Sequence, residues 1–158
     1  MTYTNEGGVG YVRFLKNIMG MWIANQVLKS TPITFAFLDR QLPLCTYKEI
    51  FNVNDPSLVA PKDMKEAVIN LLKHNPPKND VELFSSIYRS LAVCYKKSIE
   101  ELEEITNKKY SKICIVGGGA KNRFLNNVIR EYTNKEILPL PIEATCLGNI
   151  KIQMKAGE

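Results

Sequence analysis

Three consecutive glycines are the residues most suited to chemistry. Gly117, Gly118 and Gly119 follow a short apolar, β-branched run and precede a helix-like segment. Because glycine has no side chain, the backbone at such a turn can approach a ligand closely. The following helix offers free N–H groups and a positive dipole end, which favour anions such as phosphate. The pattern indicates a candidate ligand-binding turn that several types of ligand would fit, and a tight turn without a ligand remains the alternative.

Two well-known nucleotide motifs fit this turn poorly. A dinucleotide fingerprint needs Gly-x-Gly-x-x-Gly, but Asn122 stands where the third glycine belongs. The next strand ends at Pro139 and Pro141 instead of at an acidic residue. A phosphate loop of the Walker type needs Gly-Lys-Ser/Thr, which is not present. A Rossmann-type oxidoreductase is therefore only a weak alternative.

Metal and thiol chemistry is disfavoured. His74 is the only histidine, and Asn75 and Pro76 after it indicate a helix end. The four cysteines form no Cys-x-x-Cys pair, which argues against a zinc site or a disulfide framework. Free cysteines are typical of a reducing compartment, and the N-terminus has no signal-peptide pattern, so we expect a cytoplasmic protein.

Composition and charge exclude several partner classes. Hydrophobic residues make up 45% and charged residues 23%, which is typical of a globular protein. No apolar run approaches the roughly 20 residues that cross a bilayer, so we expect no membrane partner. The net charge of +5 is spread, and lysine pairs flank the acidic run 100–104 as on a solvated helix face. This favours an anionic small molecule over a nucleic acid.

Hydrophobic spacing places the glycine turn within an α/β arrangement. Apolar steps of three and four predict helices over 11–29, 60–73, 80–106, 122–132 and 143–155, the last interrupted by Gly148. Short runs predict strands over 113–116 and 136–140, and 34–38 fits either a strand or a helical turn. The alternation of strands and helices predicts a parallel sheet.

The small number of strands is itself informative. Two strands rarely form an independently stable sheet, so we expect residues 1–158 to form a single incomplete domain. Such a domain leaves a sheet edge open, and an open edge favours self-association.

Several runs along the chain resemble one enzyme family. The chain is similar to the FGGY carbohydrate kinases, in the branch that acts on L-rhamnulose. The similar runs are Asn5–Val9, Arg13–Trp22, Asn54–Met64, Ile115–Asn122 and Pro141–Asn149. The resemblance is weakest over 27–50. The glycine triplet is shared by many carbohydrate kinases, whereas the first and last runs are narrower.

The resemblance implies a fold and a reaction. The fold would be a helix-rich, partial ribonuclease-H-like domain of the actin/Hsp70 superfamily, with few parallel strands. The chain would be the C-terminal, ATP-binding domain of a kinase whose N-terminal sugar-binding domain is absent. Such kinases transfer the γ-phosphoryl group of Mg-ATP to L-rhamnulose, giving L-rhamnulose 1-phosphate, or to a similar ketose. ATP and Mg²⁺ are the implied cofactors.

Individual positions carry implied roles. Gly117, Gly118 and Gly119 would lie against the nucleotide, and Asn122 would contact its adenine or ribose. Asn25 occupies the position where the family has an ATP-side glutamine, with Gln26 beside it. Asn17 matches a sugar-contacting position.

The resemblance also implies that the catalytic machinery lies elsewhere. In this family the catalytic aspartate and the phosphate loop precede the matched segment, so this chain would hold no catalytic residue. We therefore expect the chain alone to be inactive and to need the other kinase half as its partner. The alternative is a non-catalytic remnant that binds a nucleotide or another protein.

Overall fold

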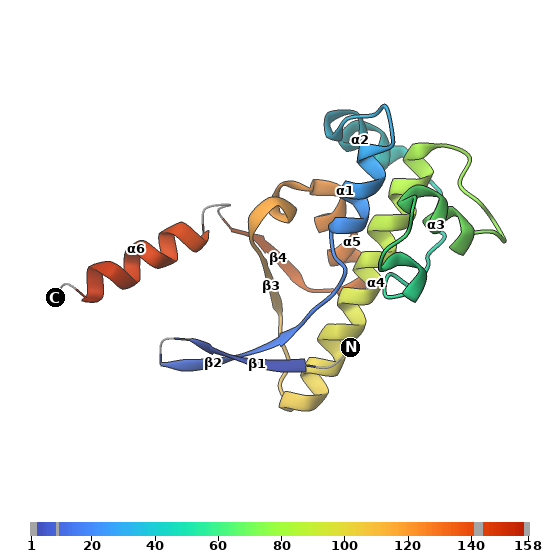
Figure 1. Cartoon of the computed structure of the whole chain (residues 1–158). Coiled ribbons are helices and arrows are strands. Elements are labelled where there is room, and N and C mark those ends of the chain that lie inside the picture. The colour runs from blue at the N-terminus through green and yellow to red at the C-terminus, as the bar shows by residue number, and fades with distance from the viewer. Residues whose placement is uncertain (1–2, 9, 141–143, 157–158) are drawn as a thin grey trace.

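The computed structural model describes residues 3–8, 10–140 and 144–156, and helices predominate in it (Figure 1). Its helices are α1 (Trp22–Lys29), α2 (Phe35–Gln41), α3 (Met64–Leu71), α4 (Asp80–Thr106), α5 (Arg123–Thr133) and α6 (Ala144–Ala156). Its strands are β1 (Tyr3–Gly8), β2 (Tyr11–Lys16), β3 (Lys112–Ile115) and β4 (Glu136–Pro139). Short 3-10 turns are η1 (Leu42–Leu44), η2 (Pro56–Leu58) and η3 (Gly117–Lys121).

The predicted α/β unit is present. Strands β3 and β4 pair in parallel, with Lys112 opposite Glu136 and Ile115 opposite Pro139. Helix α5 makes the crossover between them, as a parallel pair requires. The prediction of a helix-rich α/β chain with few parallel strands is therefore confirmed.

The expected helix over 11–29 is wrong in its first part. Residues 11–16 form strand β2, which pairs antiparallel with β1 from Gly8 opposite Tyr11 to Tyr3 opposite Lys16. Gly10 takes a positive φ of 76° in the turn between them. The helix begins only at Trp22, because the earlier apolar residues have a strand partner and no core to cover: Tyr11, Val12 and Phe14 are exposed.

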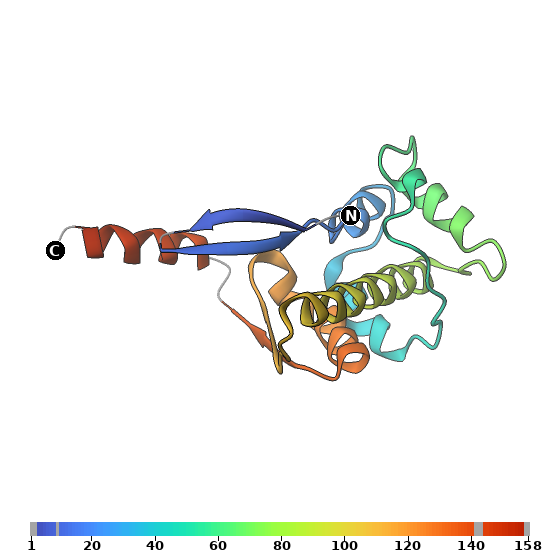
Figure 2. The same ribbon diagram turned by 90° about the horizontal axis from the view of Figure 1, so that it is seen from below.

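Helix α4 is the axis of the core. Figure 2 shows it running through the body between α1 and α5. Its bounds agree with the prediction because local signals set both ends. The Asn79 side chain accepts a hydrogen bond from the Glu82 N–H, and Asn107 ends the helix in the left-handed conformation. Buried core residues from the three helices are Ile23, Val27, Phe84, Ile87, Leu91, Leu125, Val128 and Ile129.

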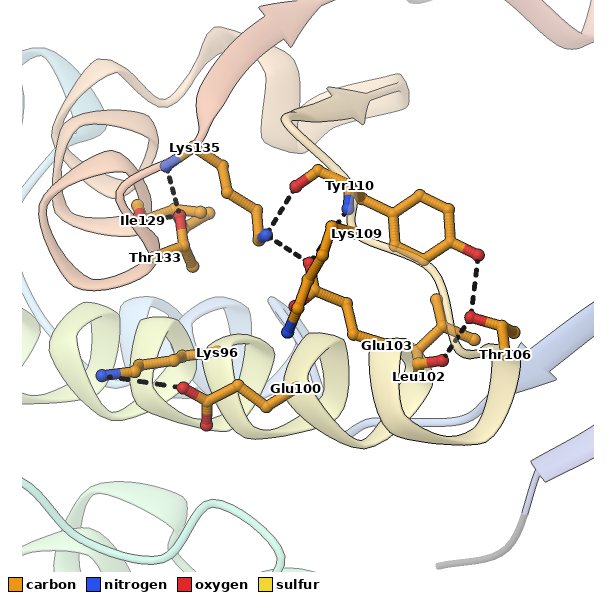
Figure 3. Close-up of polar contacts among 10 residues, drawn as sticks. All are labelled: Lys96, Glu100, Leu102, Glu103, Thr106, Lys109, Tyr110, Ile129, Thr133 and Lys135. Carbon is orange, nitrogen blue, oxygen red and sulfur yellow. Dashed lines mark hydrogen bonds and ion pairs between the residues drawn. The ribbon is translucent and has the colours of Figure 1, made fainter.

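A buried carboxylate joins the end of α4 to the sheet (Figure 3). Lys135 Nζ donates to Glu103 Oε1 at 2.6 Å and to the Tyr110 carbonyl oxygen at 2.5 Å. The Tyr110 N–H and Lys109 Nζ also donate to Glu103, both at 3.0 Å. The Lys135 hydrogen bond and these two others lower the pKa of Glu103 to about 2, so it is charged at neutral pH. This ion pair sets how β3 and β4 sit against α4.

In the remaining elements the structure decides one open alternative and moves some boundaries. Residues 34–38 take the helical of their two predicted alternatives and begin helix α2, with Thr34 as its N-cap. Helix α3 starts at Met64, capped by Asp63, so Pro61 lies before the helix and not in its first turn. Gly148 does not interrupt α6, and the predicted start of that helix at Glu143 lies outside the described residues. Helix α6 extends away from the helical body (Figure 1).

Candidate functional site

A cavity of about 620 Å³ lies where α1, α2, α4 and the glycine turn η3 meet. Small-molecule sites typically measure roughly 300–1,000 Å³. We refer to this space as the glycine-turn cavity. Its lining residues are Met21, Asn25, Phe35, Ala36, Leu38, Asp39, Leu42, Tyr88, Gly118, Gly119, Lys121 and Asn122.

The cavity brings together residues that are distant in the sequence. Asn25 of α1 faces the same space as Gly118, Gly119 and Asn122, which follow it by more than 90 positions. Gln26 instead lines a second hollow, bordered by residues 59–64. Of these two neighbouring amide residues, Asn25 is therefore the one that shares a cavity with the glycine turn.

The three glycines of the turn differ in what their surroundings require of them. Gly117 takes a φ of 73°, which an L-residue adopts only with strain, so the turn itself needs this glycine. A Cβ on Gly118 would meet no atom within 4 Å, so open space adjoins it. A Cβ on Gly119 would meet Ile115 Cγ2 at 3.6 Å, an ordinary contact. The fold therefore does not require glycine at position 118, but the missing side chain leaves space in the cavity.

Asn122 joins the turn to helix α5. Its side-chain oxygen accepts a hydrogen bond of 2.9 Å from the Leu125 N–H and so caps the helix. Asn126 Nδ2 donates to the Ala120 carbonyl oxygen at 3.0 Å and fixes the turn against the same helix. The amide oxygen has a second lone pair, so Asn122 can offer a ligand an acceptor as well as the N–H donors of its side-chain amide.

The lining of the cavity is chemically mixed. Apolar side chains come from the N-cap of α1, from α2 and from η1: Met21, Phe35, Ala36, Leu38 and Leu42. Polar groups come from the glycine turn, Lys121, Asn25 and Asn122, together with Asp39 and Tyr88. A lining that combines an apolar wall with N–H groups and a cation suits a molecule that has an aromatic part and an anionic part.

Sequence reasoning missed three polar groups of this cavity. Asp39 and Lys121 are exposed at its wall, and Tyr88 is buried with only 1% of its surface exposed. The Tyr88 hydroxyl has no hydrogen-bond partner within the described part of the chain. Burial raises its pKa to about 12, and the nearby Asn122 side chain acts in the opposite direction. In the sequence Tyr88 is one residue of a buried helix stripe, which gives no sign of a ligand.

Two of the predicted site residues do not line the cavity. Gly117 shapes the turn behind it. Asn17 is exposed in the segment between β2 and α1. Its sugar contact stays a prediction.

The described residues contain neither a metal-binding cluster nor a membrane-spanning helix. Within the described ranges, no group of three or more His, Cys, Asp or Glu side chains could hold a metal ion. Asp39 is the carboxylate that lines the cavity. No described helix is both long enough and apolar enough to cross a bilayer.

Residues 2–157 match the model of the C-terminal domain of the FGGY family of carbohydrate kinases. The chain belongs to the FGGY family. The glycine-turn cavity is therefore a feature of an FGGY C-terminal domain, and the resemblance seen in the sequence is confirmed.

Curated relatives within the FGGY family carry the name rhamnulokinase. One from Halalkalibacterium halodurans is 35% identical over 99% of the chain and 35% of its own length. One from Oceanobacillus iheyensis is 36% identical over 98% of the chain and 34% of its own length. One from Bacillus subtilis is 34% identical over 99% of the chain and 34% of its own length. The chain thus spans about a third of these relatives.

Proposed function

We propose that the chain forms the nucleotide-binding side of a carbohydrate kinase that transfers the γ-phosphoryl group of Mg-ATP to L-rhamnulose or a similar ketose. The observation that carries the proposal is the meeting of Asn25, Gly118, Gly119 and Asn122 around one cavity. The family match supports a kinase, and the name of the relatives supports this sugar.

The lining residues fit a nucleotide. Backbone N–H groups of the glycine turn and the Lys121 ammonium suit phosphate oxygens, and the apolar wall suits a base. The open space at Gly118 and the unpartnered Tyr88 hydroxyl are both features that a ligand would use. Mg²⁺ bound to ATP is held largely by phosphates and water with one or two carboxylates, and Asp39 is the carboxylate that lines this cavity.

The proposal extends to the whole domain. A ribonuclease-H-like fold would be completed by chain that the relatives possess, since the match covers about a third of their length. The sugar-binding domain and the catalytic base would come from that other part. Asn17 would then contact the sugar from this side.

Exposed apolar surface supports a partner of this kind. Tyr11, Val12 and Leu15 of β2 and Leu147 and Met154 of α6 are all exposed. Burying such surface is favourable, so we propose that the other kinase half covers it, and that the chain self-associates without that half. A cytoplasmic location remains part of the same proposal.

The test is a comparison of two nucleotides. Mg-ATP is expected to raise the melting temperature of the purified chain, because a ligand that binds only the folded state stabilises it by mass action. At 100 times Kd the gain is about 2.7 kcal/mol, or roughly 5–10 °C for a chain of this size. NAD is expected to give no shift. A shift with NAD but not with ATP would instead favour the oxidoreductase alternative.

A further inference from the structure

Tyr88 has an unusual position in the core. It lies in the middle of α4, and its ring centroid is 6.0 Å from that of Phe84 and 6.1 Å from that of Phe124. These neighbours hold the ring firmly. Its surface is 1% exposed, yet the side chain borders the glycine-turn cavity. The phenol thus packs against two aromatic rings at the wall of a ligand-sized space.

The Tyr88 hydroxyl calls for an explanation. It is buried and makes no hydrogen bond of good geometry within the described ranges, although the Asn122 side chain lies close enough to lower its pKa. Such groups are rare, because a buried polar atom without a partner destabilises the fold. Phenylalanine would fill the same volume without this penalty. Other buried side-chain atoms of the described residues also have no partner, but Tyr88 is the one of these residues that lines the glycine-turn cavity. Its hydroxyl is therefore the one placed to meet a ligand there.

The surroundings indicate which part of a ligand it meets. A phenol is protonated at neutral pH even at its ordinary pKa, and burial raises the pKa of Tyr88 further, to about 12, so the hydroxyl has a proton to donate. Apolar Leu38, Leu42 and Phe35 share the cavity wall and suit the flat face of a heteroaromatic ring. Phosphates would instead prefer the N–H groups of the glycine turn and Lys121.

We propose that the Tyr88 hydroxyl donates a hydrogen bond to a ring nitrogen of the purine base of the bound nucleotide and so helps to select that base. The inference rests on the proposed function, because it requires a nucleotide in the glycine-turn cavity. Purine ring nitrogens N1, N3 and N7 of adenine are unprotonated acceptors that lie in the plane of the ring. A fixed neutral donor at the wall matches that chemistry.

Tyr88→Phe is expected to change stability and affinity in opposite directions. Without ligand, the melting temperature should rise by roughly 2–4 °C, because the unpartnered hydroxyl is gone. The affinity for Mg-ATP should fall about tenfold. A purely structural tyrosine would not produce this pair of signs. Tyr95→Phe is the matched control, since Tyr95 is a half-buried tyrosine on the same helix that does not line this cavity.

Deaza analogues identify the acceptor atom. We expect one of 1-, 3- or 7-deaza-ATP to bind wild type about tenfold more weakly than ATP does, and to lose nothing more in Tyr88→Phe. If all three bind wild type as tightly as ATP, the inference is wrong. It is also wrong if the loss in Tyr88→Phe disappears only with 2′-deoxy-ATP, which would place the contact on the ribose.

The two proposals fail in different ways. If wild type binds no nucleotide, the proposed function and this inference both fall. If wild type binds ATP and Tyr88→Phe binds it equally well, only the role of Tyr88 falls, and the kinase proposal stands.

Discussion

Gly118→Val is expected to lower the affinity for Mg-ATP by roughly 100-fold or more, which corresponds to about 2.7 kcal/mol. The added side chain would stand in the open space beside Gly118, where a Cβ meets no protein atom within 4 Å. Its backbone is not in the left-handed region, so valine adds no strain of that kind. The fold should therefore survive while the ligand is excluded. Isothermal titration calorimetry with Mg²⁺ present measures the affinity.

Two further variants make this result specific. Gly7→Val is the matched control, because Gly7 also has open space and lies in β1, away from the cavity. It should bind ATP as wild type does. Gly118→Ala should give an intermediate loss, since alanine fills less of the space. Wild-type affinity in Gly118→Val would contradict a nucleotide against this turn.

The 158-residue chain alone is expected to transfer no detectable phosphate from ATP to L-rhamnulose. Phosphoryl transfer depends on positioning, charge stabilisation and a base for the attacking hydroxyl. A positioned base contributes about 10²–10⁴-fold in rate, and we propose that it lies in the part of the relatives beyond the match. Supplying the unmatched part of the Bacillus subtilis rhamnulokinase should restore ADP release that depends on the sugar.

A variant that blocks the cavity serves as the control for this restoration. The same mixture made with Gly118→Val should stay inactive, whereas the chain with its native Gly118 should support turnover. Turnover by the isolated chain would overturn the division of labour that we propose. If Gly118→Val restores turnover as well as the native residue does, the cavity takes no part in the reaction.

Elements with local end signals could be predicted from the sequence. Helix α4 spans the predicted residues because Asn79 caps it and Asn107 ends it, and both act within a few residues. Helix α5 is similar, with Asn122 at its start and Asn134 in the left-handed conformation at its end. Such signals need no knowledge of the rest of the fold.

The N-terminal hairpin could not be predicted, because its partner is another segment. Val12, Leu15 and Ile18 recur at helical spacing, yet β2 pairs with β1 and the Tyr3 hydroxyl donates to the Ser98 carbonyl oxygen of α4 at 2.6 Å. The apolar residues do recur at helical spacing, but strand pairing across the turn at Gly10 gives this segment an extended backbone. Tertiary pairing here overrides local spacing.

The candidate site was predictable only where its residues stand out locally in the sequence. The glycine triplet stands out from its residue types, and Asn25 came from the family resemblance. Tyr88, Phe35 and Asp39 did not stand out, since Tyr88 resembles any core residue of a buried helix and the type of segment 34–38 was open. What makes Tyr88 distinctive is an unpartnered hydroxyl, which only three-dimensional contacts reveal.

The central claim is that a nucleotide occupies the glycine-turn cavity, and a ¹⁵N–¹H correlation spectrum recorded during titration with Mg-ATP tests it most directly. At 17.9 kDa the chain is small enough for residue-level assignment. We predict that the largest saturable shifts fall on the amides of Gly118, Gly119 and Asn122, with Asn25 among them. Shifts confined to other surfaces, or no shifts from a folded chain at millimolar ATP, would contradict the claim.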